Sequence, residues 1–159
     1  MTHGRTGLLV PALILCFAAL AWGDEMHPMG QNPAQMKFMN FPNLPSCATG
    51  AVVNGDPGKG PSIILAKMTA GCTIPWHWHT PSEHLMMVSG SARLGSKDGK
   101  PFTLRTGGFD VLPSHHAHEF HANTACTLYI YSDAPFDIHY VNAKGDEITF
   151  DDAVHAKKR

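Results

Sequence analysis

Short apolar runs separated by turn-forming residues make up most of the chain after residue 45. The runs are rich in β-branched and aromatic residues, and Gly, Pro, Asn and Asp lie between them, as in N-G-D-P-G-K-G-P at 54–61. Without a helical period, this pattern predicts an all-β protein with an antiparallel sandwich or barrel. An edge strand is expected at 37–41, and further short strands at 51–53, 62–68, 73–79, 83–88, 92–94, 102–104, 109–112, 118–121, 126–131, 138–141 and 147–150.

The N-terminal segment differs from the rest of the chain. One early arginine, Arg5, precedes an apolar run from Leu8 to Trp22, and the small residues Ala19, Ala21 and Gly23 close it. The run is short for a membrane span, which needs about 20 apolar residues, so residues 1–23 are predicted to be a signal peptide. An uncleaved anchor is the alternative. We therefore expect a periplasmic or secreted protein with no membrane contact after cleavage.

The remaining chain has the length of one domain. We expect an N-terminal arm with its edge strand at 24–45, a single barrel at 46–150 and a C-terminal tail at 151–159. The 12 Lys and Arg residues nearly balance the 13 Asp and Glu residues, for a net charge of −1. Such a surface lacks the basic patch of a nucleic-acid-binding protein, so no nucleic-acid partner is expected.

The segment G-C-T-I-P-W-H-W-H-T-P-S-E-H-L-M-M-V-S-G at 71–90 carries the clearest chemistry. His77 and His79 are two residues apart, so on a strand their side chains point to the same face. Glu83 begins the next run after the short turn at 80–82 and can close on that face as a third ligand. Imidazole and carboxylate ligands together suit a divalent transition metal: iron, manganese, nickel, copper or zinc. A polar cluster without metal is the alternative.

This spacing, G-x5-H-x-H-x3-E-x6-G, resembles the first motif of the cupin superfamily at every defining position. A second cupin motif, G-x5-P-x-G-x2-H-x3-N, is matched in part from Gly107 through Pro113, with His115 at the motif's second glycine and Ala122 at its asparagine. The resemblance implies one cupin-type, jelly-roll antiparallel β-barrel holding one metal, with His118 as the fourth ligand beside His77, His79 and Glu83. The closing stretch A-P-F-D-I-H-Y-V-N-A-K-G-D resembles a C-terminal element of small bacterial cupins. These cupins are similar to the barrel domain of zinc-binding anti-sigma factors.

Strand alternation predicts which residues lie near the metal. If Glu83 and His118 point inward, then Leu85, Met87 and Phe120 do too, and with Leu112 they are expected to line an apolar substrate pocket. Trp76, Trp78 and Met86 would face outward, which favours a homodimer. His115 and His116 precede the fourth ligand; one could carry protons at the pocket mouth, or both could simply be exposed.

Three of the four cysteines follow the N-terminal apolar segment, at positions 47, 72 and 126. If the strand entering the first motif lies beside the strand after His118, Cys72 and Cys126 could form a disulfide. The alternative is that both are small buried residues.

The ligand set and its apolar neighbours favour an exported metal-dependent enzyme of the dioxygenase type. Its small organic substrate would bind the metal through two oxygen atoms, with Glu83 as ligand and catalytic base. Two alternatives stay open from the sequence: a non-catalytic metal-binding or small-molecule-sensing module, and a metal-dependent lyase or decarboxylase.

Overall fold

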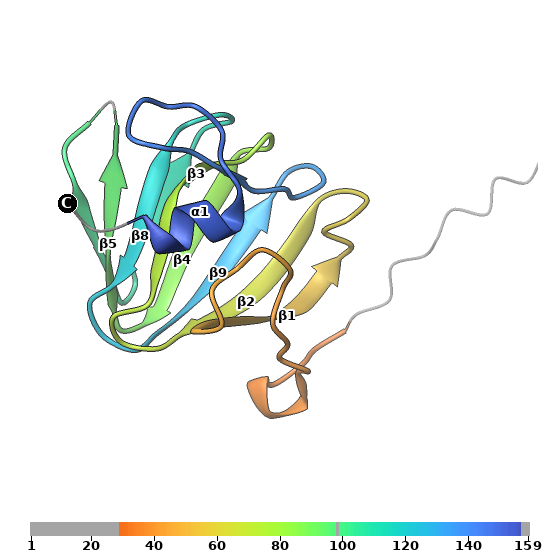
Figure 1. The fold of residues 1–159 in the computed structure, drawn as a ribbon. Coiled ribbons are helices and arrows are strands. Elements are labelled where there is room, and N and C mark those ends of the chain that lie inside the picture. Colours follow the sequence, from red (N-terminus) through yellow and green to blue (C-terminus); the bar gives the residue numbers. More distant parts are fainter. Residues whose placement is uncertain (1–28, 98, 157–159) are drawn as a thin grey trace, which may run out of the picture. The chain divides into compact units, whose positions relative to one another are not determined.

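Two five-stranded antiparallel sheets form the fold of the described residues, which are 29–97 and 99–156 of the computed structural model. The first sheet has the order β1-β2-β9-β4-β7 and the second the order β10-β3-β8-β5-β6 (Figure 1). The strands are β1 (Ala48–Gly55), β2 (Ser62–Met68), β3 (Thr73–Trp78), β4 (Glu83–Ser89), β5 (Ser91–Ser96), β6 (Phe102–Arg105), β7 (Phe109–Leu112), β8 (His118–Ala122), β9 (Cys126–Ser132) and β10 (His139–Tyr140).

The chain passes repeatedly from one sheet to the other. Only β1–β2 and β5–β6 are paired strands consecutive in sequence, whereas β2 pairs with β9, β3 with β8, and β4 with both β7 and β9. Two facing antiparallel sheets with such crossings are a jelly roll, so the predicted all-β, jelly-roll antiparallel barrel is confirmed. Residues from strands distant in sequence therefore meet in its interior.

Alternation along the strands places the core between the sheets. In β4 the buried positions are Glu83, Leu85 and Met87, while His84 and Met86 between them are only partly buried. β8 repeats the pattern with His118 and Phe120 buried. The largest fully buried apolar side chains are Leu65, Leu85, Leu104 and Leu128. The polar ligand candidates thus share one interior with the apolar core.

The ends of the domain differ from the sequence prediction. The expected strand at 37–41 is a single bridge between Met39 and Gly50, and the one at 147–150 is a bridge between Val141 and Glu147. Beyond it, α1 (Phe150–His155) is a short helix that the pattern did not indicate. Its Thr149 N-cap accepts a hydrogen bond from the Asp152 backbone N–H, and six residues are too few for a visible helical period. No helix in the described ranges is long and apolar enough to cross a membrane.

Three glycines of the two motifs occupy left-handed backbone positions. Gly71, Gly90 and Gly107 have φ values of 79°, 81° and 80°, a region that costs other residues energy. At Gly90 a Cβ would also lie 2.3 Å from the carbonyl oxygen of Ala125. The motif spacing therefore reflects backbone turns as well as metal ligands.

The disulfide joins Cys47 and Cys72, so the suggested Cys72–Cys126 pairing is wrong. The turn after β2 brings Cys47 and Cys72 together, because the Thr69 N–H donates to the Cys47 carbonyl and the Cys72 N–H donates to the Thr69 carbonyl. Cys126 is free and buried, opposite Met68 in the β2–β9 pairing. The disulfide thereby ties the segment before β1 to the strand that carries His77.

Replacing Cys47 and Cys72 together by Ala should lower the free energy of unfolding by about 3 kcal/mol, since the bond closes a loop of 25 residues. Urea unfolding followed by tryptophan fluorescence measures the change. Dithiothreitol should destabilise the unmodified protein by a similar amount and leave the double variant unaffected. Cys126→Ala is the control, and it should keep its sensitivity to dithiothreitol; a Cys126→Ala protein indifferent to reductant would contradict the pairing.

Candidate metal centre

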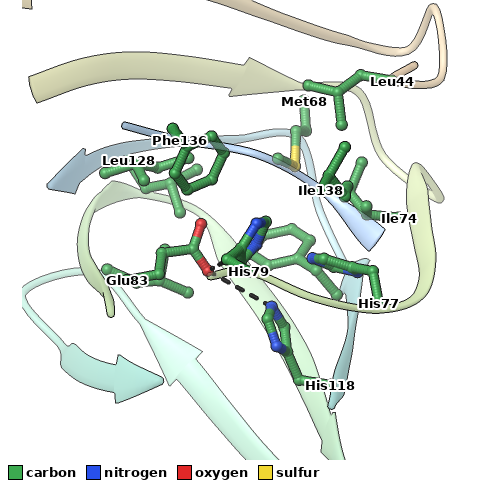
Figure 2. A pocket seen from close by; sticks show the side chains of 13 residues that line it. Leu44, Met68, Ile74, His77, His79, Glu83, His118, Leu128, Phe136 and Ile138 are labelled. Atoms are coloured by element: carbon green, nitrogen blue, oxygen red, sulfur yellow. Dashed lines mark ion pairs between the residues drawn. The ribbon is translucent and has the colours of Figure 1, made fainter. Parts of the chain in front are cut away.

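Three buried histidines converge inside the barrel. His77 lies on β3, His79 follows the end of β3, and His118 begins β8 directly opposite His77. One nitrogen from each lies within 4.8 Å of the others, and their exposed fractions are 4%, 4% and 2% (Figure 2). Three of the four side chains expected to bind metal are thus brought together at one point.

A bulge in β3 sets the direction of these side chains. Ile74 pairs with Phe120 and His77 with His118, so β3 has one more residue than β8 between the two pairs. The irregularity coincides with Pro75, which has no N–H to donate to a neighbouring strand. Because of the extra residue, Ile74 and His77 are both buried, although three positions apart.

Backbone carbonyls hold all three imidazoles by their Nδ1 atoms. His77 Nδ1 lies 2.6 Å from the Pro75 oxygen and His118 Nδ1 lies 2.9 Å from the His116 oxygen. His79 Nδ1 makes the same kind of bond to the Asp137 oxygen. A carbonyl can only accept, so each Nδ1 donates its proton and each Nε2 keeps a lone pair. Such bonds are typical of metal-binding histidines.

Glu83 completes the cluster from the start of β4. Its Oε2 atom lies 3.4 Å from His118 Nε2 and 3.7 Å from His79 Nε2, and the side chain is buried. With Nδ1 protonated, the nearby nitrogens and the carboxylate are all acceptors, and His79 Nε2 has no hydrogen-bond partner. Buried acceptors facing one another call for a cation between them. The residues therefore fit a divalent transition metal.

Burial and neighbouring side chains shift the pKa values of His77, His79 and Glu83. Burial, with the neighbouring His118 and His79, lowers the pKa of His77 well below its ordinary value of 6.5. Burial likewise lowers the pKa of His79, against the opposing effect of Glu83. For Glu83, burial favours the protonated acid, but His79 and His118 outweigh it and leave its pKa below the usual value. An imidazole binds a metal in its neutral form and a carboxylate in its ionised form.

A small apolar pocket surrounds the cluster. Of the predicted lining residues, Leu85 and Phe120 are on its wall, whereas Met87 and Leu112 are buried in the core and do not line it. Met87 lies two residues further along β4 than Leu85, about 7 Å from it, and Leu112 pairs with Glu83 from the edge strand β7. Lining residues that the sequence did not indicate are Leu44, Met68, Ile74, Leu128, Ile130, Phe136 and Ile138.

The histidines of the second motif lie beside the cluster, not in it. His115 has a φ of 60°, so the position where the cupin motif has glycine keeps the left-handed backbone, and its N–H donates to the His79 carbonyl at 2.8 Å. His116 Nε2 lies 3.0 Å from Ser96 Oγ. Trp78 stacks on His115 and on His139, at centroid separations of 4.5 and 3.9 Å. Part of this indole is therefore covered within the chain.

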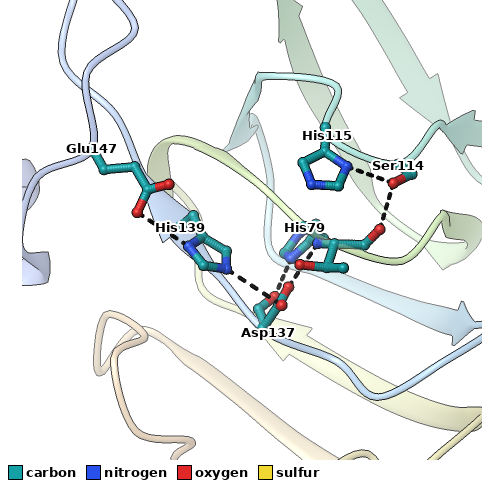
Figure 3. A network of polar contacts seen from close by, with 7 residues as sticks. His79, Ser114, His115, Asp137, His139 and Glu147 are labelled. Atoms are coloured by element: carbon teal, nitrogen blue, oxygen red, sulfur yellow. Dashed lines mark hydrogen bonds and ion pairs between the residues drawn. The ribbon is translucent and has the colours of Figure 1, made fainter.

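His139 in turn lies between two carboxylates. Its Nε2 is 3.3 Å from an Asp137 oxygen and its Nδ1 is 3.3 Å from a Glu147 oxygen (Figure 3). The Asp137 carboxylate also accepts from the Thr80 N–H at 2.7 Å. Because the Asp137 carbonyl accepts from His79, this network helps to fix the orientation of the His79 ring from outside the pocket.

Comparison with known families agrees with this geometry. The family model described as "Cupin domain" matches residues 64–131, which span β2 through most of β9 and include all four ligand candidates. This match and the shared jelly-roll fold both support the cupin superfamily. No curated protein sequence matches the chain.

Several solved structures share the fold at low sequence identity. An RmlC-like cupin from Shewanella frigidimarina is 16% identical with a TM-score of 0.58, over 69% of this chain and 92% of that one. The polyketide cyclase RemF from Streptomyces resistomycificus is 15% identical with a TM-score of 0.63, over 73% and 87%. Salicylate 1,2-dioxygenase from Pseudoaminobacter salicylatoxidans, seen with gentisate, is 18% identical with a TM-score of 0.50, and only 26% of its chain is covered against 57% of this one.

Single replacement of His77, His79 or His118 by Ala should lower metal affinity at least a hundredfold, because each removes a nitrogen already aimed at the shared point. Metal content after dialysis and isothermal titration measure the loss. His116→Ala and His121→Ala are matched controls outside the cluster, and both should keep full metal content. An equal loss of metal affinity in His116→Ala and His118→Ala would show that the second motif has been assigned in the wrong register.

The metal-free protein should lose stability as the pH falls below about 6.5. The pKa values of His77 and His79 are depressed in the folded state, so protons bind the unfolded chain first and favour unfolding. The contribution is complete above the unfolded pKa and declines through the acid range. Urea midpoints between pH 7.5 and 5 measure it. His77→Phe should flatten the dependence, whereas an unchanged slope would show that His77 is not held neutral.

Proposed function

We propose that the protein is an exported metal-dependent enzyme of the dioxygenase type, with His77, His79, Glu83 and His118 holding one divalent transition metal. The observation that carries the proposal is the set of buried acceptor atoms facing one another within an apolar pocket. When bound, a redox-active metal in such a site supplies Lewis-acid polarisation and electron transfer to dioxygen. A dioxygenase among the proteins that share the fold supports this class.

The chain's own residues prepare the site in three ways. The carbonyls that accept from each Nδ1 fix the imidazoles before any ligand binds, so little conformational entropy is lost when the ligand binds. Apolar walls that include Phe136 and Leu85 keep bulk water from the cluster. Glu83, ionised and buried, accepts the proton that an enol or phenol releases when its oxygen binds at the cluster.

Purified protein loaded with ferrous iron should consume dioxygen when given a β-diketone or a flavonol, measured with an oxygen electrode and by product mass. Glu83→Gln should lower kcat by about a hundredfold or more, through loss of the base. His121→Ala should retain full activity. Turnover that persists without dioxygen would identify a lyase or decarboxylase instead, and tight metal binding without turnover on any substrate would identify a binding module.

Export is a further part of the proposal, supported by the apolar segment at 8–22, which lies outside the described residues, and by the Cys47–Cys72 disulfide. The mature chain is expected to begin near Trp22 or Asp24. Intact-mass measurement on protein from the periplasmic or culture fraction determines the start. A chain that still begins at Met1 would contradict cleavage.

A further inference from the structure

A second and much larger cavity adjoins the pocket at the histidine cluster. Its walls are the segment 41–44, the inner face of β1 and β2, the turn at 57–58 and the segment 136–139. The two cavities share the lining residues Leu44, Met68, Ile130, Phe136 and Ile138. Phe136 lines both cavities and stacks on the His79 ring at a centroid separation of 4.3 Å. Figure 2 shows it among the residues that line the inner pocket.

The sizes of the cavities limit what can bind. The inner pocket has a volume of about 60 Å³, which accommodates a few water molecules but no complete organic substrate. The outer cavity has about 460 Å³, within the range of roughly 300–1,000 Å³ for small-molecule sites. An organic molecule that reaches the cluster must therefore extend into the outer cavity.

The outer cavity is ordered before any ligand binds. The Tyr140 hydroxyl donates to the Asn43 carbonyl at 2.7 Å, and the Cys47–Cys72 disulfide anchors the same segment to the barrel. The bridge between Met39 and Gly50 fixes the segment on its other side. These three links hold the segment 41–44, one wall of the cavity, against the barrel.

The lining also indicates the charge of the ligand. Among the described residues that line either cavity there is no Lys or Arg. The acidic residues are Glu83 at the cluster and Asp137 at the outer wall, and Asp137 already pairs with His139 and the Thr80 N–H. His139, which also lines the outer cavity, already lies between the Asp137 and Glu147 carboxylates. A carboxylate or phosphate there would therefore meet no unpaired cationic partner, and burying an unpaired charge is costly. The walls instead offer apolar side chains, including Phe41, Ile64 and Ile138.

We propose that the two cavities form one binding site for a neutral, largely apolar molecule. Two adjacent oxygen atoms at one end reach the histidine cluster, and the hydrocarbon body fills the outer cavity against the segment 41–44. This assignment rests on the proposed metal site, whose substrate class it narrows to uncharged phenol-, enol- or diketone-bearing compounds with an aromatic or aliphatic body.

The test compares three probes by isothermal titration against zinc-loaded protein, in which no turnover complicates binding. Benzoylacetone has a phenyl body, acetylacetone has the same diketone without it, and gentisate has an aromatic ring with a carboxylate. Benzoylacetone should bind at least tenfold more tightly than either of the others, because only it places an uncharged ring in the outer cavity.

Ala66→Phe places a ring in the outer cavity, since Ala66 lines it from β2 without lining the inner pocket. Affinity for benzoylacetone should fall at least tenfold, while zinc content stays at the level of the unmodified protein. Ile63→Phe is the matched control on the same strand, at a position that lines neither cavity, and it should change affinity less than twofold. Thr49→Phe, which enters the cavity from β1, replaces Ala66→Phe should that variant fail to fold.

The proposal is overturned if gentisate binds as tightly as benzoylacetone, if benzoylacetone does not bind, or if a ring at position 66 or 49 leaves its affinity unchanged. Failure of the enzyme proposal looks different. If benzoylacetone binds in the outer cavity but the iron-loaded protein takes up no oxygen, the dioxygenase proposal is wrong and the binding-site proposal stands. If the protein binds no metal, the titrations are done without zinc. A loss of benzoylacetone affinity in Ala66→Phe but not in Ile63→Phe then still supports the cavity assignment.

Discussion

The hydrogen bonds from three imidazole Nδ1 atoms to backbone carbonyls are the interactions on which the site depends. In each one the Nδ1–H donates to the carbonyl oxygen, which keeps the proton on Nδ1 and leaves Nε2 as an acceptor. Without them, a buried histidine could rotate or change tautomer and donate to Glu83. With these hydrogen bonds in place, the cluster presents only acceptor atoms, and a cation is the partner that satisfies these atoms.

These carbonyls come from three separate parts of the chain. Pro75 belongs to the bulge in β3, His116 to the turn before β8, and Asp137 to the segment before β10. Each lies where regular strand pairing is interrupted, so its carbonyl is free of a strand partner. The irregularities of the barrel are therefore as necessary for the site as its regular strands, and the network of Asp137, His139 and Glu147 supports one of them from outside.

The same segments that orient the ligands also shape the space around them. Asp137 lies between Phe136 and Ile138, which are common to both cavities. The opposite wall comes from the segment that precedes β1, held by the disulfide and by Tyr140. A compound bound in the outer cavity would thus contact the chain close to the carbonyl that holds His79, which links the shape of the ligand to the geometry of the cluster.

The sequence by itself determined the fold class and, by local rules, the ligand candidates His77, His79 and Glu83, whereas the resemblance to the second cupin motif indicated His118. Two-residue alternation places His77 with His79 and Glu83 with Leu85, and turn glycines such as Gly71 mark the ends of strands. The short helix α1 escaped prediction because a single turn and a half shows no period. Only the tertiary structure decided the pairing of Cys47 with Cys72, the displacement of Met87 and Leu112 from the pocket, and the outer cavity. Those features depend on which distant segments pack together in space, and the spacing of residues along one chain does not contain that information.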